Sequence, residues 1–197
     1  MNTGVYTELA QWKDKFLDLS DMDLVQHIDQ KYLDAGTVDG KVIGIPATIE
    51  AFGFLYNKDV LDEAVGGNFD PNSVKSREDL EILMGKIDQL DEKSAIEVSP
   101  LDWSLGAHYT NLFFTNQSEE QGERAKFMTD MQGGIVGLSE NQVFQNWVDT
   151  FDMMKTYNSA AKSPLSADYD SATLALANGD VGLWFMGNWA YPQLKEA

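Results

Sequence analysis

The chain has 197 residues, 43% of them hydrophobic and 11% aromatic, which suffices for a packed core in one large or two small domains. Acidic residues number 32 against 14 basic ones, and the formal net charge of −18 argues against nucleic acids and anionic membranes as partners. Cysteine is absent, which excludes disulfides, thiolate nucleophiles and cysteine-ligated metal sites.

No stretch of the sequence approaches the roughly 20 apolar residues of a membrane span. Its first residues resemble neither a secretory signal nor a lipid-attachment signal. We therefore expect any membrane association to depend on an anchor that is absent from this chain.

The first part of the chain reads as two helices. Apolar residues spaced three or four apart predict an amphipathic helix over residues 6–19 and a shorter helix over residues 20–33. The stripe of the first helix is Leu9, Trp12, Phe16 and Leu19.

Strand-like sequence follows. Residues 38–41 read as a turn, 42–46 as a short strand ended by a proline, and 47–56 as a longer strand. Glu50 is the single carboxylate inside this apolar run, so it either faces solvent from the strand or meets a partner, water or a ligand.

The next segments indicate an α/β sheet. A short helix is expected from Val60 to about Gly66, a longer helix opens on a capping box at Ser76, and residues 94–98 read as a strand. This strand, helix, strand order predicts a parallel sheet.

A mixed polar and aromatic segment follows that strand. Asp102, Trp103 and His108 bring together a carboxylate, an indole and an imidazole where the carboxyl end of a strand is expected, and α/β proteins build their sites there. The alternative is the start of an amphipathic helix that packs Trp103 on the sheet.

The following segments are expected to support the sheet. Residues 119–131 read as charged and exposed, and a helix capped by Ser139 is expected to bury Trp147. A loop over residues 163–170 leads to a small-residue helix over 171–177.

The chain then reaches its most informative stretch, a strand over residues 181–186 that runs into Gly187, Asn188 and Trp189. Glycine permits a tight turn, and the asparagine is expected to cap a following helix, leaving free backbone N–H groups and an indole at the edge of a sheet. Trp184 is expected in the core, and Trp189 is either packed or available to a ligand.

The sequence carries no catalytic signature that we recognise. His27 and His108 are in no metal-ligand spacing, so no metal, cofactor or catalytic residue is predicted. A carbohydrate-active hydrolase that uses Glu50 and Asp102 as an acid and base pair stays open as an alternative.

Four short motifs, in this order and spacing, carry a family resemblance. They are DGKVIGIP at residues 39–46, LYNKD at 55–59, ANGD at 177–180 and GNW at 187–189. Together they resemble the extracellular solute-binding proteins of bacterial ABC transporters, and more closely the sugar-binding family that includes maltose-binding protein. The resemblance covers essentially the whole chain.

The resemblance implies a two-lobed periplasmic-binding-protein-like fold of type II, present here incompletely as a middle section. Residues 1–48 resemble a fragment of the first lobe, 49–54 a strand that crosses the hinge, and 55–197 most of the second lobe. Such a chain is expected to bind weakly, because closing two lobes supplies the contacts. Its exposed apolar surface also suggests self-association.

The resemblance further implies a non-enzymatic protein that captures a carbohydrate, expected to be an oligosaccharide, and delivers it to permease subunits. The place of action would be the periplasm or the extracellular face of the membrane. Glu50 resembles a hinge glutamate that binds sugar hydroxyls, and Trp189 an indole that stacks on a sugar ring. Asn188 and three residues placed by their position after the expected strand, and not by a motif, complete the expected ligand site: Asp102, Trp103 and His108.

Overall fold

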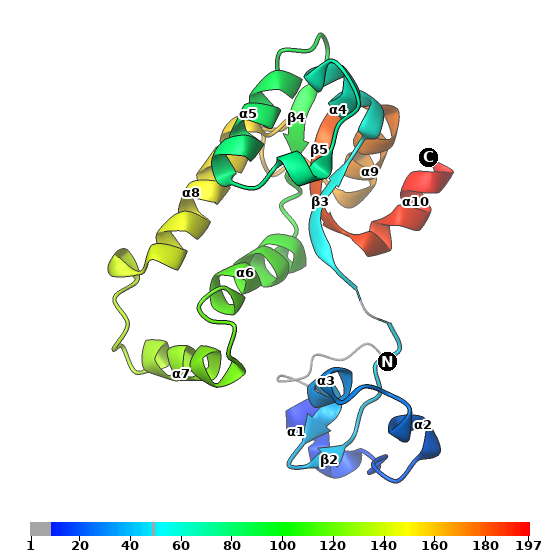
Figure 1. The fold of residues 1–197 in the computed structure, drawn as a ribbon, viewed down its shortest axis with the longest axis vertical. Helices are drawn as coiled ribbons and strands as arrows, with labels where there is room; N and C mark the ends of the chain where they lie inside the picture. The colour runs from blue at the N-terminus through cyan, green and yellow to red at the C-terminus, as the bar shows by residue number, and fades with distance from the viewer. Residues whose placement is uncertain (1–8, 49) are drawn as a thin grey trace. The chain divides into compact units, whose positions relative to one another are not determined.

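The computed structural model describes residues 9–48 and 50–197. The chain divides into two compact units, Met1–Glu50 and Ala51–Ala197. Figure 1 shows both units.

The first unit is built from short elements around a small core. The helices are α1 (Ala10–Trp12), α2 (Asp23–Gln26) and α3 (Gln30–Leu33), and the strands β1 (Thr37–Val38) and β2 (Lys41–Val42) form a hairpin. The core comprises Val25, Leu33 and Val42. Asp39 and Gly40 form the turn of this hairpin, at the place of the turn predicted over residues 38–41. Their φ angles are 51° and 78°, and a two-residue hairpin turn of type I′ needs positive φ angles at both positions.

Three predictions in this unit are wrong. The first three residues of the helix expected over residues 6–19 lie outside the described residues. In the described part, the helical backbone ends before Phe16, which is extended. The reason is tertiary, because the Leu19 N–H donates to the Val42 carbonyl at 2.7 Å. The helix expected over residues 20–33 is split into α2 and α3, and the strand expected over 42–46 keeps only Val42 in β2.

The second unit is organised on a three-stranded sheet with the order β3-β5-β4. The strands are β3 (Phe52–Tyr56), β4 (Ser94–Glu97) and β5 (Val181–Gly187). Because β5 pairs antiparallel with β3 and parallel with β4, the sheet is mixed, and the predicted parallel sheet is wrong. The strand expected over residues 47–56 begins only at Phe52.

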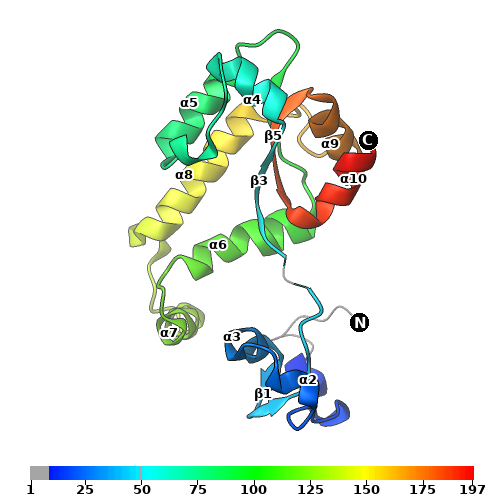
Figure 2. The same ribbon diagram turned by 45° about the vertical axis from the view of Figure 1, so that its right-hand side comes forward.

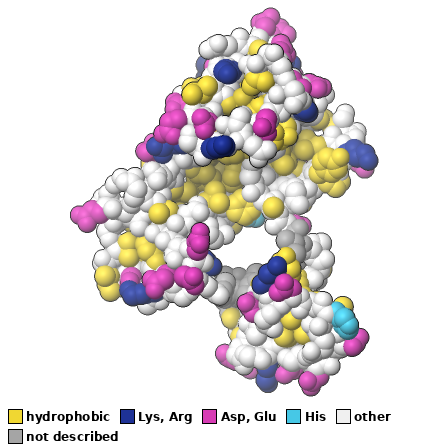
Figure 3. Space-filling model, in the orientation of Figure 1, with side chains coloured by type: hydrophobic (Ala, Val, Ile, Leu, Met, Phe, Trp, Pro, Cys, Tyr) yellow, Lys and Arg dark blue, Asp and Glu magenta, His cyan; other side chains and the backbone are white. Residues whose placement is uncertain are grey.

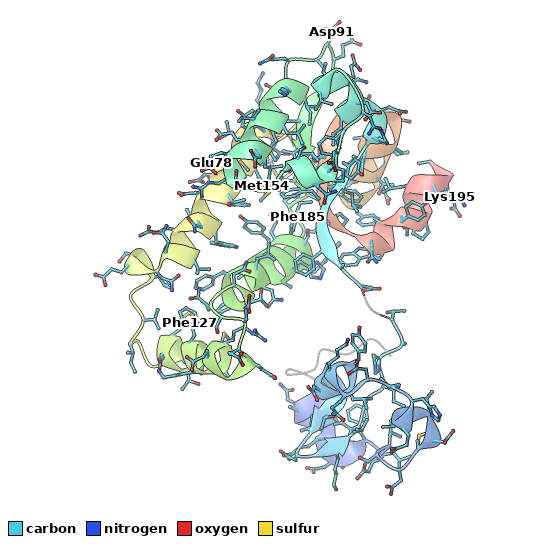
Figure 4. All side chains as sticks on the ribbon, in the orientation of Figure 1. Glu78, Asp91, Phe127, Met154, Phe185 and Lys195 are labelled. Atoms are coloured by element: carbon cyan, nitrogen blue, oxygen red, sulfur yellow. The ribbon has the colours of Figure 1, made fainter. Side chains whose placement is uncertain are left out.

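Helices cover both faces of this sheet (Figures 1 and 2). The larger core joins one face to α4 (Lys58–Val65), α5 (Arg77–Ile87) and α8 (Gln142–Tyr157). The smaller core joins the other face to α9 (Tyr169–Asn178) and α10 (Tyr191–Glu196). Phe185 of β5 and Met154 of α8 are buried in the larger core (Figure 4), whereas Trp184 is completely buried in the smaller one, as predicted.

Local sequence explains where several helices start. Asn57 accepts hydrogen bonds from the N–H groups of Asp59 and Val60 at the start of α4, and Ser76 forms the predicted capping box with Asp79 at the start of α5. The expected cap at Ser139 is wrong, because Asn141 caps α8 and Ser139 lies in a preceding 3₁₀ turn.

The remaining elements connect β4 to α8. A π-helical segment (Asp102–Tyr109) runs into α6 (Thr110–Thr115), and α7 (Gln121–Gln132) follows with no buried residue. Trp147 packs against the larger core but is only half-buried, and its Nε1–H donates to the Tyr109 carbonyl at 3.0 Å. None of the helices in the described residues is long and apolar enough to cross a membrane.

Candidate functional site

The sheet brings three chain segments to the same end. Gly187, the last residue of β5, lies opposite Phe52, the first residue of β3, and β4 ends beside Trp184 of β5. The segment after β4 enters the π-helical turn at Asp102. These connections place Phe52, residues 102–109 and Trp189 close together.

Four rings from these segments form one group, which we call the aromatic cluster: Phe52, Trp103, His108 and Trp189. The His108 ring stacks on Phe52, with centroids 4.8 Å apart and planes inclined by 18°. It also lies 5.0 Å from Trp189 and 5.6 Å from Trp103, and the two indoles are 6.1 Å apart. Trp103 is 37% exposed, so the cluster presents an aromatic surface to solvent.

Gly187 is necessary for the position of Trp189. A Cβ atom added at residue 187 would lie 2.0 Å from Cζ3 of the Trp189 ring. The indole therefore packs against the end of its own strand only because residue 187 has no side chain.

Asn188 has a different role from the expected helix cap. Its side-chain oxygen accepts the Ala51 N–H at 3.1 Å, and its backbone N–H donates to the Ala51 carbonyl at 2.9 Å. Asn188 is itself the first residue of a 3₁₀ turn (Asn188–Ala190) that has no side-chain cap. The prediction of an asparagine cap is therefore wrong, and of the N–H groups expected to be free after β5, that of Asn188 is bonded to the Ala51 carbonyl.

The two predicted carboxylates are both exposed. Asp102 accepts the backbone N–H of Trp103 at 2.7 Å, which orients the first turn of the π-helical segment beside the aromatic cluster. Glu50 is the last residue of the first unit, directly before Ala51. Its part in binding stays a prediction, as does that of every other predicted site residue.

Sequence reasoning missed two aromatic neighbours. Phe52 was expected only as a strand residue, and Tyr169 was placed in a loop, yet the Tyr169 ring lies 6.3 Å from Trp103 and 5.3 Å from Trp184. The alternation of β3 could have indicated Phe52, because its odd and even residues face opposite sides of the sheet. For Tyr169 the sequence offers only its place in the first turn of α9.

A buried polar group lies nearby on β4. Glu97 is 6% exposed, one of its carboxyl oxygens accepts the Ser159 hydroxyl, and Oε1 has no hydrogen-bond partner among the described residues. Burial raises the pKa of the Glu97 carboxyl, the Ser159 hydrogen bond opposes this, and the Asp168 charge adds to it. The sequence reading of residues 94–98 as a plain strand did not single this residue out.

The chemistry of the aromatic cluster is that of a binding surface. Flat indole faces suit an apolar ring face, and the imidazole, amide and carboxylate groups beside them suit hydroxyl groups. Within residues 9–48 and 50–197 we find no group of three or more histidine, aspartate or glutamate side chains that could hold a metal ion.

Comparison with solved structures finds the same fold. The solute-binding protein RafE in complex with raffinose is 24% identical and matches 96% of this chain and 48% of its own, with a TM-score of 0.75. The apo form of RafE from Streptococcus pneumoniae is also 24% identical, matching 99% of this chain and 49% of its own with a TM-score of 0.77. A Streptococcus pneumoniae solute-binding protein in complex with the blood group A-trisaccharide is 17% identical, matching 98% and 47% with a TM-score of 0.62.

These matches confirm the predicted α/β fold of the periplasmic-binding-protein type II, and the chain spans about half the length of the structures it matches. No match was found among curated proteins. The family model of the bacterial extracellular solute-binding proteins matches residues 2–197. The chain therefore belongs to the bacterial extracellular solute-binding protein family.

Proposed function

We propose that the chain is part of the substrate-binding component of an ABC importer, which captures an oligosaccharide and delivers it to membrane permease subunits. Membership of the extracellular solute-binding family supports a place of action in the periplasm or on the outer face of the membrane. Structures with the same fold include complexes with raffinose and with the blood group A-trisaccharide, which supports a sugar as the ligand.

The aromatic cluster is the observation that carries this proposal. Sugar rings present C–H groups on one face, and stacking that face on an indole contributes about 1 kcal/mol beyond area burial. Trp103 and Trp189 supply two indoles with centroids 6.1 Å apart, and a sugar ring can stack on either of them.

Polar groups would fix the sugar hydroxyls. We assign this role to Asp102, His108 and Asn188 of the second unit, and also to Glu50, the last residue of the first unit. Asn188 already uses its side-chain oxygen on the Ala51 N–H, so its amide NH₂ group is the donor proposed for a ligand hydroxyl.

Binding without catalysis is the function we propose. The family match gives no support to a hydrolase that uses Glu50 and Asp102. Turnover of an aryl glycoside by the chain, lost in both Glu50→Gln and Asp102→Asn, would instead establish the hydrolase.

Intrinsic tryptophan fluorescence during titration with mono- and oligosaccharides tests the proposal. We expect a quench or spectral shift with an oligosaccharide, abolished in Trp189→Ala and retained in Trp12→Ala. Trp12 is a matched control because it lies in the first unit and is 58% exposed. The absence of any response, in this chain and in a version extended at both ends, would contradict a sugar ligand.

The affinity of the chain alone is expected to be low. If a complete protein bound with a Kd near 1 μM, about −8 kcal/mol, a chain that supplies half of that free energy would bind in roughly the millimolar range. Calorimetry that shows micromolar binding by this chain would contradict the division of the site between two lobes.

A further inference from the structure

Glu97 is an acidic side chain in an unusual place. Figure 3 shows aspartate and glutamate side chains spread over the face of the molecule that it displays, where water can solvate them. Glu97 is instead 6% exposed, and its Oε1 atom has no hydrogen-bond partner among the described residues. A buried carboxylate is costly because its ionised form has lost its hydration. The closed structure therefore favours the protonated form of Glu97.

The groups around Glu97 do not neutralise its charge. Glu97 is paired in register with Trp184 of β5, so both side chains lie on the face of the sheet that α9 covers. Ser159, from the segment between α8 and α9, donates its hydroxyl hydrogen to Glu97. The charged group that acts on Glu97 is Asp168 at the start of α9, and its charge has the same sign. An ionised Glu97 thus meets one hydrogen-bond donor and one repelling carboxylate.

Few contacts attach the α8–α9 loop (residues 158–168) to the sheet. The Ser159 N–H donates to the Ile96 carbonyl at 2.8 Å, and Asn158 Oδ1 accepts the Val98 N–H at 3.0 Å. Beyond Ser159 the backbone hydrogen bonds of the loop are those of local turns, and residues 161–166 are exposed. The contact between Ser159 and Glu97 therefore lies where the loop is attached to β4.

Ser159 also separates Glu97 from solvent. A cavity of about 590 Å³ is lined by Ser159 and other residues of the loop, by Ser94 of β4 and by Thr156 of α8. Glu97 is not among the residues that line this cavity, whereas its hydrogen-bond partner Ser159 is. An outward movement of Ser159 would let water from the cavity reach the carboxylate.

We propose that Glu97 and Ser159 form a pH-sensitive latch, in which protonated Glu97 keeps the α8–α9 loop attached to β4 and ionisation of Glu97 releases it. Ionisation calls for water at the carboxylate and adds repulsion from Asp168, and outward movement of the loop relieves both. The Ser159 hydrogen bond opposes release, since it favours the ionised form. One hydrogen bond does not replace the hydration that a buried carboxylate has lost.

The latch lies next to the aromatic cluster. The loop ends at Asp168, which caps α9, and the next residue, Tyr169, places its ring 6.3 Å from Trp103. Burial raises the pKa of the Tyr169 hydroxyl, so this ring stays neutral while Glu97 titrates. Release of the loop should loosen the support of Trp103 and weaken ligand binding. This consequence, unlike the latch itself, rests on the proposed function.

Amide hydrogen exchange of the whole chain tests the latch. Exchange of the residue 159 N–H, corrected for the intrinsic effect of pH, should accelerate by up to about tenfold per pH unit above 4.5, the ordinary pKa of the carboxyl, and level off at the raised pKa of Glu97. Glu97→Gln keeps an acceptor and cannot ionise, so its corrected rate should stay slow at every pH. The same acceleration in Glu97→Gln would overturn the proposal.

The Met84 N–H separates release of the loop from unfolding of the whole unit. Met84 is completely buried in α5, so its amide reports global unfolding. The residue 159 amide should exchange faster than the Met84 amide. Equal corrected rates at the two positions would mean that Glu97 acts only through global unfolding, which would also overturn the proposal.

Two substitutions should move the pH dependence in opposite directions. Asp168→Asn removes the repulsion and keeps a helix-capping side chain, so exchange should level off at a lower pH. Ser159→Ala removes the hydrogen bond that favours the ionised form, so exchange should level off at a higher pH. Asp170→Asn is the matched control, because it removes a neighbouring acid that is not among the charges acting on Glu97. Shifts of the same sign in the first two variants, or equal shifts in Asp168→Asn and Asp170→Asn, would contradict the latch.

Ligand titration tests the link to the aromatic cluster separately. The Kd for an oligosaccharide, measured by tryptophan fluorescence, should rise with pH over the same range in the original protein and stay constant in Glu97→Gln. A Kd that is independent of pH in the original protein would contradict this link. A chain that binds no sugar would count against the proposed function and not against the latch, because exchange at residue 159 is measured without a ligand.

Discussion

Asn188 and Ala51 hold each other by two hydrogen bonds although they are 137 residues apart in the chain. The Asn188 side-chain oxygen accepts the Ala51 N–H, and the Ala51 carbonyl accepts the Asn188 N–H. The turn that carries Trp189 is thereby tied to the point where the chain enters β3. The aromatic cluster depends on this tie, since Phe52 and Trp189 are the next residues on each side.

Replacing the Asn188 side chain tests the tie. Asn188→Ala removes one acceptor at an exposed position and should lower the free energy of unfolding by about 0.5–1.5 kcal/mol, measured by urea denaturation. Asn188→Asp keeps the acceptor oxygen and should lower the free energy of unfolding by less. If the aspartate variant is as unstable as the alanine variant, the Ala51 hydrogen bond is not the cause.

Adding a methyl group at Gly187 tests the packing of the indole. Gly187→Ala should displace the Trp189 ring, cost about 1–3 kcal/mol and change the near-ultraviolet circular dichroism. Gly53→Ala is the matched control in β3, because a Cβ atom there meets nothing within 4 Å. An unchanged spectrum and stability in Gly187→Ala would contradict the position assigned to Trp189.

The buried indole of Trp184 depends on one hydroxyl. Its Nε1–H donates to Ser99 Oγ at 3.1 Å, and both side chains are at most 1% exposed. Ser99→Ala leaves this donor unpaired and should lower the free energy of unfolding by about 1–3 kcal/mol. Ser99→Ala made in the Trp184→Phe variant should lower the free energy of unfolding by less, because phenylalanine has no N–H donor. If the two losses are additive in a double-mutant cycle, Trp184 and Ser99 are not coupled.

Glu97 should make stability depend on pH. Burial raises the pKa of this carboxyl above its ordinary value of 4.5, so the folded state holds the proton more tightly than the unfolded state. The contribution of Glu97 is favourable below pH 4.5 and is lost as the pH rises through the raised pKa of the folded state.

Glu97→Gln removes the titrating carboxyl group. The measurement is urea denaturation of the original protein and of the variant, from below pH 4.5 to above the raised pKa of Glu97. The free energy of unfolding of the original protein should fall relative to the Glu97→Gln variant as the pH rises. A difference that stays constant with pH would contradict the raised pKa. Ser159→Ala should steepen the fall, because the Ser159 hydrogen bond favours the ionised carboxylate.

Local signals in the sequence predicted those parts of the fold that local physics determines. The capping box at Ser76 and the strand that ends at Gly187 follow from side-chain chemistry and hydrophobic pattern, and the structure has both. The direction of β3 relative to β4 could not be read locally, because β5 lies between them and pairs with each in a different sense.

The candidate site shows the same limit. Trp103, His108 and Trp189 were singled out by their positions after expected strands, and the structure brings their rings together. Asn188 was misread because its partner, Ala51, lies far away in the sequence. Glu97 was overlooked because the alternation of residues in a strand does not show which face of the strand other elements bury.

The central place of β5 also determines when the sheet can form. Among the three strands of this sheet in the described residues, β5 comes last in the sequence, yet both β3 and β4 bond to it and not to each other. Until residue 187 is available, the two earlier strands have no partner in this sheet, so their pairing must wait for nearly the whole second unit. During synthesis β3 and β4 therefore stay without their partner in this sheet until β5 has been made.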